Sequence, residues 1–319
     1  MTFDRGPLQR ACAALASQGV FLGTSSWKYA GWRGQIYDEA RYLWHGRFAE
    51  KRFEQNCLAE YAEVFPTVCV DGAYYRFPEP RFLAGLLDQV PASFLFAFKV
   101  TDEITLKRFP HLPRFGARAG QMNPGFLDAA RMTSAFLEPC QPYRAQVGLL
   151  IFEFSRFYPI DFARGREFVA ALDQFLGQLP KGWPYGVEMR NPNFLQPEYF
   201  ATLARHEVAH IYNSWSGMPS VLEQMALPVS APHPGLCGAR FLLRPGRKYQ
   251  EAVDRFQPYD RLQDPYPEAR QAGAKLIADG KKAGPKRRTF LYVNNRLEGN
   301  AILTVQAMLE AAAGLTEGG

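Results

Sequence analysis

The run GLLIFEFS (148–155) is a short apolar stretch that ends on polar residues, and it decides the fold because the chain repeats its pattern. Stretches with helical character separate most of these runs. Strands that alternate with helices predict an α/β protein with a (β/α)₈ TIM-barrel-like fold, whose active face is formed by the C-terminal ends of the strands. The eight runs are FLGTSSW (21–27), TVCVDGAYYR (67–76), FLFAFKVTDE (94–103), GLLIFEFS (148–155), YGVEMRN (185–191), HIYNSW (210–215), GARFLLRPGRK (238–248) and TFLYVNN (289–295).

The segments between the runs carry apolar residues at the spacing of amphipathic helices. Three connections, residues 101–125, 216–237 and 245–267, are long, and long ordered loops in a compact domain are usually functional. We expect helices over Arg52–Phe65, Arg81–Leu87, Phe126–Leu137, Phe168–Leu179, Pro197–His206, Glu268–Ala278 and Asn300–Ala313, with Asn300 as a candidate N-cap.

Length and composition suit one globular barrel. The chain has 319 residues with 47% apolar content, and no repeat, low-complexity tract or linker divides it. We therefore predict a single domain over residues 1–319, with a core of about 20–313 and an N-terminal lead-in over 1–19 that does not resemble a signal peptide. No apolar run approaches the ~18 residues needed to cross a membrane. Five widely spread cysteines favour reduced thiols and a cytoplasmic location.

The formal net charge of +6 is concentrated in the basic segment Lys281–Arg288. A solvated loop leading into the last strand explains this segment. Alternatively, the segment is an electrostatic handle for nucleic acid or another polyanion. No aromatic residue is interleaved in it, which argues against a platform that stacks single-stranded bases.

Two glutamates at the ends of neighbouring predicted strands are candidates for acid/base chemistry. Glu153 and Glu188 come from the fourth and fifth runs, and adjacent strands lie ~4.8 Å apart. Such a spacing allows a general acid/base pair, and Lys99 is a third candidate catalytic residue. Alternatively, one glutamate only orients Arg190 or Lys99.

Cationic and amide side chains are predicted to bind an anionic group. Residues two apart share a strand face, so Glu188 and Arg190 point the same way, as do Arg240, Leu242 and Arg244. Alternatively, Glu188 and Arg190 form a salt bridge that plugs the barrel mouth. Loops after the seventh and eighth strands commonly bind phosphate in this fold, and arginine suits phosphate or carboxylate. The candidate substrate-binding residues here are Arg190, Arg244, Arg247, Asn294 and Asn295. The alternative for the loop after strand seven is pairing with Asp254, Asp260 or Asp264.

Aromatic residues gather at the same strand ends, and such residues often stack on sugars or bases. Trp27, Trp32 and Tyr75 are predicted to form walls of the pocket, although packing beneath the loops also explains each one singly. Three smaller polar candidates at strand ends are Ser25, Asp71 and Asn213.

The segment His206–His210 matches the zinc-protease pattern H-E-x-x-H, which requires both histidines on one continuous helix. Here the expected helix ends near Glu207 and His210 opens a strand. Neither a third ligand nor a dinucleotide or P-loop signature is evident. We therefore predict no metal and no cofactor.

Four strand-end motifs resemble those of the DUF72 (YecE-like) family. They are Gly23–Trp32, Val70–Pro78, Val187–Pro192 and Tyr292–Asn295, and the similarity covers roughly residues 20–310. The resemblance implies a TIM-barrel-like fold and no established activity. The chain departs from the family pattern at Asp71 and Gly72, where asparagine followed by serine or threonine is usual, and at Glu153, where glutamine is frequent.

The sequence thus predicts a metal-independent enzyme, with hydrolysis the favoured reaction. Its substrate is expected to be small and either anionic (a phosphate or carboxylate) or polyhydroxylated, bound at the C-terminal face of the barrel. The alternative, from another class, is a non-catalytic protein that binds nucleic acid or nucleotides. No membrane association is expected.

Overall fold

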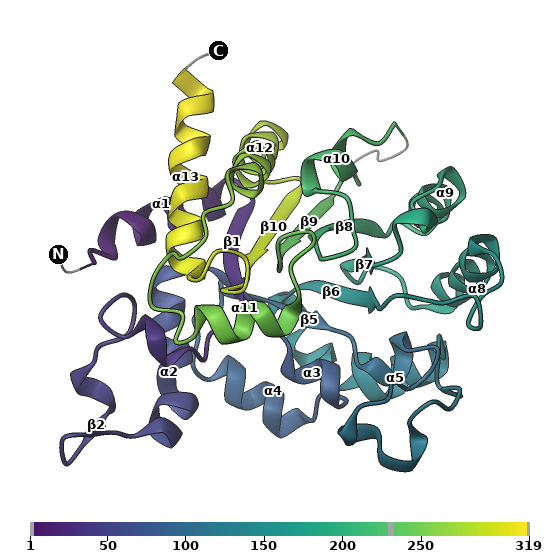
Figure 1. Ribbon diagram of the computed structural model, residues 1–319, viewed down its shortest axis with the longest axis horizontal. Helices are drawn as coiled ribbons and strands as arrows, with labels where there is room; N and C mark the ends of the chain where they lie inside the picture. The colour runs from purple at the N-terminus through teal and green to yellow at the C-terminus, as the bar shows by residue number, and fades with distance from the viewer. Residues whose placement is uncertain (1–2, 229–232, 318–319) are drawn as a thin grey trace.

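The computed structural model describes residues 3–228 and 233–317. Its strands form a closed parallel barrel in the order β1-β10-β9-β8-β7-β6-β5-β4, which confirms the predicted fold (Figure 1). The barrel strands are β1 (Val20–Ser25), β4 (Thr67–Val70), β5 (Leu95–Lys99), β6 (Val147–Phe154), β7 (Tyr185–Met189), β8 (Ala209–Ser214), β9 (Leu236–Phe241) and β10 (Arg288–Val293).

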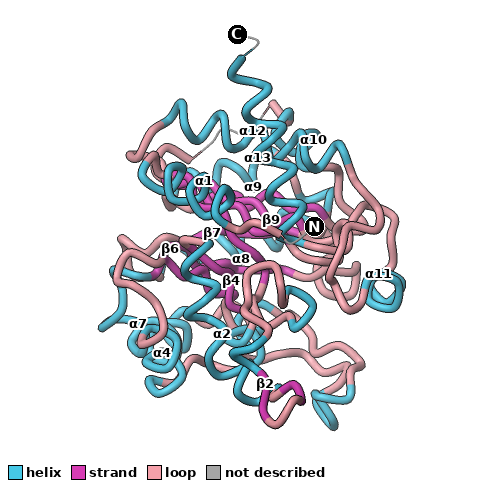
Figure 2. Tube along the Cα trace, turned by 90° about the vertical axis from the view of Figure 1, so that its left-hand side faces the viewer, coloured by secondary structure: helices cyan, strands magenta, loops and turns pink. Residues whose placement is uncertain are grey.

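Helices surround the strands, as the view turned by 90° shows (Figure 2). Those that follow barrel strands include α2 (Glu50–Val64), α3 (Gly72–Tyr75), α4 (Pro80–Leu87), α5 (Asp102–Thr105), α8 (Gly165–Gln178), α9 (Pro197–Arg205), α10 (Val221–Ala226), α11 (Tyr249–Phe256), α12 (Pro267–Ala283) and α13 (Ala301–Glu317). The expected lead-in contains a further helix, α1 (Gly6–Ser17). Asn300 precedes α13, and its Oδ1 accepts a hydrogen bond from the backbone N–H of Leu303, as expected of an N-cap.

Two elements differ from the sequence-based expectation. The run at 238–248 forms strand only as far as Phe241, so its later residues belong to a loop. The helix expected from Phe126 begins at Ala129, as α6 (Ala129–Arg131), and continues through a π-helical turn into α7 (Glu138–Cys140). The positive φ of Leu127 (55°) breaks the helix there, and Asp128 caps the shorter helix by accepting a hydrogen bond from the Arg131 N–H.

A short hairpin, β2 (Leu43–Trp44) with β3 (Arg47–Phe48), lies outside the barrel. Among the described residues, no helix is long and apolar enough to span a membrane. The five cysteines are buried with free thiols, and burial raises the pKa of the Cys12 thiol to about 12.

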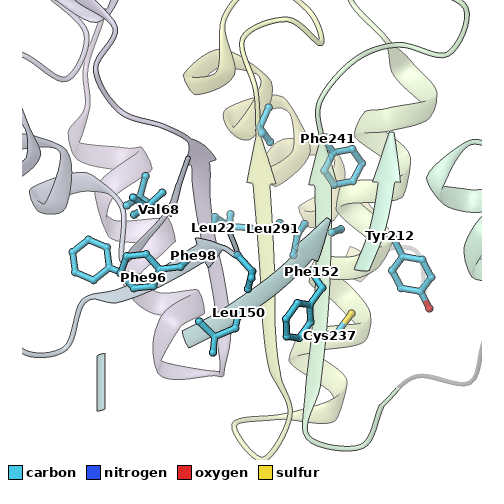
Figure 3. Close-up of a cluster of buried hydrophobic side chains, with 14 of the residues drawn as sticks. Leu22, Val68, Phe96, Phe98, Leu150, Phe152, Tyr212, Cys237, Phe241 and Leu291 are labelled. Atoms are coloured by element: carbon cyan, nitrogen blue, oxygen red, sulfur yellow. The ribbon is translucent and has the colours of Figure 1, made fainter. Parts of the chain in front are cut away.

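Outward-facing strand residues pack against the helices and form the larger part of the core. Figure 3 shows part of this layer, with Leu22 of β1, Phe96 and Phe98 of β5, Phe152 of β6 and Leu291 of β10. Burying a large apolar side chain contributes about 1.5–3 kcal/mol, so this layer holds the helices on the barrel.

A separate cluster fills the inside of the barrel, where glycines make room for large side chains. Ile211 packs there with Leu149, Phe290 and Tyr292. A Cβ added at Gly238 would lie 2.6 Å from Ile211 Cδ1, and one added at Gly186 would lie 2.5 Å from the same atom. The interior is thus a packed plug with no room for an extra methyl group, and ligands have access only at its ends.

We predict that Gly238→Ala lowers the free energy of unfolding by about 1–3 kcal/mol, because the new methyl group overpacks the barrel interior. Urea denaturation would measure the change. Gly85→Ala is the matched control, since no atom lies within 4 Å of its added Cβ and Gly85 is inside α4. Equal stability of Gly238→Ala and wild type would contradict the tight packing.

His210 faces outward from β8 and is held in its neutral form. Its Nδ1 lies 3.0 Å from the hydroxyl of Tyr199, and the rings of Tyr199, Phe200 and Tyr212 surround it edge-on. Burial lowers the pKa of His210 to about 4, despite an opposing effect of Gln224. An unfolded chain therefore binds a proton at this histidine at a higher pH than the folded protein does.

This difference predicts that the contribution of neutral His210 to the free energy of unfolding is fully present above about pH 6.5. The contribution is lost as the pH is lowered toward about 4. Allowing for partial exposure of the ring, His210 should account for about 2 kcal/mol of the loss. Urea denaturation at several pH values should show a shallower decline for His210→Gln. The exposed His111→Gln is the control, and an identical pH dependence of His210→Gln and wild type would refute the assignment.

Candidate functional site

The last inward-facing residue of every barrel strand is polar, and together these residues cap the apolar plug. Each lies two residues beyond an inward-facing residue of the same strand, as the alternation of a strand requires. We call this set the polar ring: Ser25, Asp71, Lys99, Glu153, Glu188, Asn213, Arg240 and Asn294. Its members come from all eight strands, so the fold itself assembles the site at the C-terminal face.

A single carboxylate oxygen organises the cations of the ring. Oε2 of Glu153 lies 2.7 Å from Nη2 of Arg190, 2.7 Å from Nη1 of Arg240 and 2.9 Å from Nζ of Lys99. The side chain of Glu153 is only 3% exposed. Such a pattern of short, charge-assisted contacts fixes three cations around one buried anion.

Glu188 completes the network and is fully buried. Its Oε2 accepts from Nη1 of Arg240 at 2.6 Å, and its Oε1 accepts from Nε of Arg190 at 3.0 Å. Asp71 contributes more weakly, since its Oδ1 lies 3.6 Å from Arg240 and 3.8 Å from Lys99. Three carboxylates of the ring therefore face its two cations and the adjacent Arg190, and together these six charges balance.

The ion pairs keep Glu153 ionised. Burial alone would raise the pKa of this carboxyl, but Arg190, Lys99 and Arg240 outweigh burial and hold the pKa well below its usual range. The pKa of Lys99 is raised, because Glu153 and Asp71 outweigh the effect of its burial. A carboxylate with three cationic partners is a good hydrogen-bond acceptor and a poor proton donor.

Parts of the network remain accessible from the mouth of the barrel. Asp71 is the most exposed charged group, with 33% of its side chain accessible, against 10% for Lys99 and 11% for Arg190. Two aromatic rings cover the cations on their other sides. Lys99 Nζ lies 3.8 Å from the ring centre of Tyr74, and the Arg190 guanidinium lies 3.9 Å from that of Trp215.

Four members of the polar ring retain a buried polar atom that makes no hydrogen bond within the described residues. They are Oγ of Ser25, Oδ1 of Asp71, Oδ1 of Asn213 and Nε of Arg240. Buried polar atoms are nearly always hydrogen-bonded, so a cluster of exceptions at one end of a barrel marks a place that a ligand or solvent completes.

Other predicted site residues lie nearby but support the barrel. Trp32 is completely buried and donates from Nε1 to Oδ1 of Asn295 at 3.2 Å, which ties the loop after β1 to the end of β10. Trp27 is also buried, whereas Tyr75 is 61% exposed and lies outside the mouth. Asn294 belongs to the ring and caps a turn by accepting from the Arg296 N–H.

The loop after β9 does not bring its arginines to the polar ring. Arg247 forms an ion pair with Asp264 and donates to the carbonyl of Leu297, and Arg244 lies 3.5 Å from the same aspartate. The structure therefore shows the predicted alternative for this loop, pairing with Asp264. The sequence-based choice of Arg244 and Arg247 as anion-binding residues rested on their place in the loop after the seventh strand.

Arg240 is the ring member that the sequence-based site omitted. It is 2% exposed and contacts both glutamates, whereas the sequence-based site included Arg244 from the same run. The available signal was the period of two, since β9 ends at Phe241 and only Arg240 can occupy its last inward position.

Two sequence features lie away from the mouth. The basic segment Lys281–Arg288 precedes β10 and therefore lies at the opposite end of the barrel from the strand-end aromatics. It therefore does not form one surface with them. The H-E-x-x-H segment is split as expected: α9 ends at Arg205, and His206 pairs with Asp173 while His210 lies in β8.

These features define a parallel (β/α)₈ barrel with a charged layer across its C-terminal face. The family described as "Protein of unknown function DUF72" matches residues 21–317, so the chain belongs to the DUF72 family and the predicted resemblance is confirmed. No curated protein matches the sequence.

Solved structures of the family share the fold. A DUF72 family protein of Enterococcus faecalis V583 is 18% identical, with a TM-score of 0.60 over 92% of this chain and 95% of its own. A DUF72 family protein of Thermotoga maritima MSB8 is 16% identical, with a TM-score of 0.57 over 93% of this chain and 99% of its own. At these identities the likeness concerns the fold alone.

We predict that Glu153→Gln lowers the free energy of unfolding by about 3–5 kcal/mol, because it leaves buried cations without their shared anion. Urea denaturation would measure the loss. Asp173→Asn is the control, since it removes a more exposed carboxylate paired with Arg205 and His206 and should cost at most about 1 kcal/mol. A loss below that of the control would show that Glu153 does not organise the network.

Proposed function

We propose that the protein is an enzyme that binds a small anionic substrate at the polar ring and hydrolyses it there. The observation that carries this proposal is the cluster of four buried polar atoms that make no hydrogen bond within the described residues, set among fixed charges. Fixed donors and acceptors that await a ligand are the usual form of electrostatic preorganisation.

In this proposal the glutamates position the cations and do not transfer protons. Glu153 and Glu188 hold Arg190, Arg240 and Lys99 through contacts of 2.6–3.0 Å, so the donor atoms stay in place as charge develops on the substrate. This arrangement supports the orienting role that the sequence left open. Lys99 and Arg190 are the cations with accessible surface, and they contact the anionic group of the substrate.

Asp71 acts as the general base in this proposal. It is the most accessible carboxylate of the ring, and its Oδ1 makes no hydrogen bond within the described chain. In hydrolysis, the oxygen of a water molecule attacks the electrophilic carbon or phosphorus, and a proton of that water passes to Asp71. The bond to the leaving group breaks, and the leaving group departs with the bonding electrons, while Lys99 and Arg190 stabilise the negative charge.

A screen of phosphate esters, carboxylic esters and glycosides tests the proposal. With the best substrate, Asp71→Asn should lower kcat by about 10²–10⁴ because the general base is lost. Arg190→Gln should mainly raise KM, because it removes a cation that binds the substrate in its ground state. Asp254→Asn, an exposed aspartate on α11 at the same face, is the matched control and should leave both constants unchanged.

Full activity of Asp71→Asn would remove Asp71 from the mechanism. Absence of turnover in the whole screen, together with absence of anion binding by the wild type, would refute the proposed function. Thermal denaturation of each variant distinguishes a loss of chemistry from a loss of folded protein.

A further inference from the structure

A second cavity lies beside the polar ring, between the loop after β5 and the loop after β6. Its volume is about 460 Å³, which is within the range of sites for small molecules. We call it the basic groove, and its principal lining residues are Tyr74, Lys107, Arg108, Arg114, Arg156 and Tyr158. The loop that forms one wall belongs to the long connection 101–125.

The groove carries more positive charge than its carboxylates neutralise. Arg114 pairs with Asp102 at 2.5 Å, and Arg108 pairs with Asp161 at 3.3 Å. Within residues 3–228 and 233–317, Lys107 and Arg156 have no carboxylate partner. Two positive charges of the lining are therefore left uncompensated.

Lys107 and Arg156 each lie near aromatic rings. Lys107 Nζ lies 5.1 Å from the ring centres of both Phe126 and Phe162, and the Arg156 guanidinium lies 5.6 Å from that of Tyr158. Such contacts fix a cation without neutralising it. Tyr158 is itself 57% exposed, which leaves apolar surface for an organic group.

The basic groove is continuous with the polar ring through Tyr74. The Tyr74 ring carries Lys99 of the ring at 3.8 Å and Arg114 of the groove at 5.7 Å. Ser155 also lines the groove and follows the end of β6, two residues after Glu153. Tyr74 thus separates the groove from Lys99 of the polar ring.

We propose that the basic groove binds the phosphate group of a ligand whose other end reaches the polar ring. A phosphate monoester carries close to two negative charges at neutral pH, which matches the two uncompensated cations, whereas a carboxylate or sulfate ester carries one. The phosphate site is thus beside β5 and β6, and the loops after β9 and β10 do not supply it. That the other end of the ligand reaches the polar ring rests on the proposed function.

Calorimetric titration of the full-length protein at low ionic strength tests the groove, with phenyl phosphate, phenyl sulfate and benzoate as probes. At about pH 7.5, above the second phosphate pKa of about 6, phenyl phosphate is a dianion and the other two are monoanions of similar shape. Phenyl phosphate should bind about tenfold more tightly than either, and Lys107→Gln/Arg156→Gln should abolish this preference. Lys281→Gln/Lys282→Gln removes the same charge at the other end of the barrel and should change affinity less than about twofold.

Three outcomes would overturn the proposal that the basic groove binds phosphate. They are no binding of phenyl phosphate, an equal loss of affinity in the control variant, or a loss of affinity in Arg190→Gln but not in Lys107→Gln/Arg156→Gln. The last outcome would place the phosphate at the polar ring, which supports the proposed function while refuting the groove. Conversely, binding that depends on Lys107 and Arg156, in a protein with no turnover, would support the groove and refute the proposed function. Inorganic phosphate, titrated in parallel, shows whether the organic group adds affinity.

Discussion

The contact of one carboxylate oxygen, Oε2 of Glu153, with three cations is the interaction on which the functional face depends. Burying charges is unfavourable unless each is paired and hydrogen-bonded, and the ring satisfies this condition for Lys99, Arg190 and Arg240 at once. Removing the Glu153 carboxylate would leave its buried cations without their shared anion. The ring is therefore a single electrostatic unit that the eight strands hold together.

This unit explains why some charged groups at the barrel mouth fix the geometry while others are accessible to a ligand. The glutamates are inaccessible and fully engaged, so they fix geometry. The accessible groups are Asp71 and the outer surfaces of Lys99 and Arg190, and these are available to a ligand. A neutral network that leaves part of Lys99 and Arg190 accessible can bind an anion without reorganising, which is the condition for effective electrostatic stabilisation.

The fold was largely predictable from the sequence, because eight apolar runs of strand length alternate with helical segments and that order admits few architectures. The alternation of strand faces also identified Glu153, Glu188 and Lys99 as neighbours. Strand ends were less predictable. Nothing local in GARFLLRPGRK shows that the strand stops at Phe241, so the sequence did not single out Arg240 as its last inward-facing residue.

Burial was the other property that the sequence did not reveal. Trp32 and Tyr75 are both aromatic and both follow a strand, yet one is completely buried and the other is largely exposed. The difference arises from contacts distant in sequence, such as the hydrogen bond between Trp32 and Asn295. Likewise, the net charge of the basic groove depends on which carboxylates form ion pairs with the loop after β5. Some of these pairs, such as Arg108 with Asp161, join residues that are distant in sequence.

The most direct test of the charged ring as an anion site is a crystal structure of the protein soaked with tungstate, located by its anomalous scattering. The account predicts a tungstate within hydrogen-bonding distance of Lys99 and Arg190, with the contacts between Glu153 and its three cations unchanged. A mouth that binds no anion at saturating tungstate, or one in which Glu153 releases Arg190 or Lys99 when the anion binds, would contradict it.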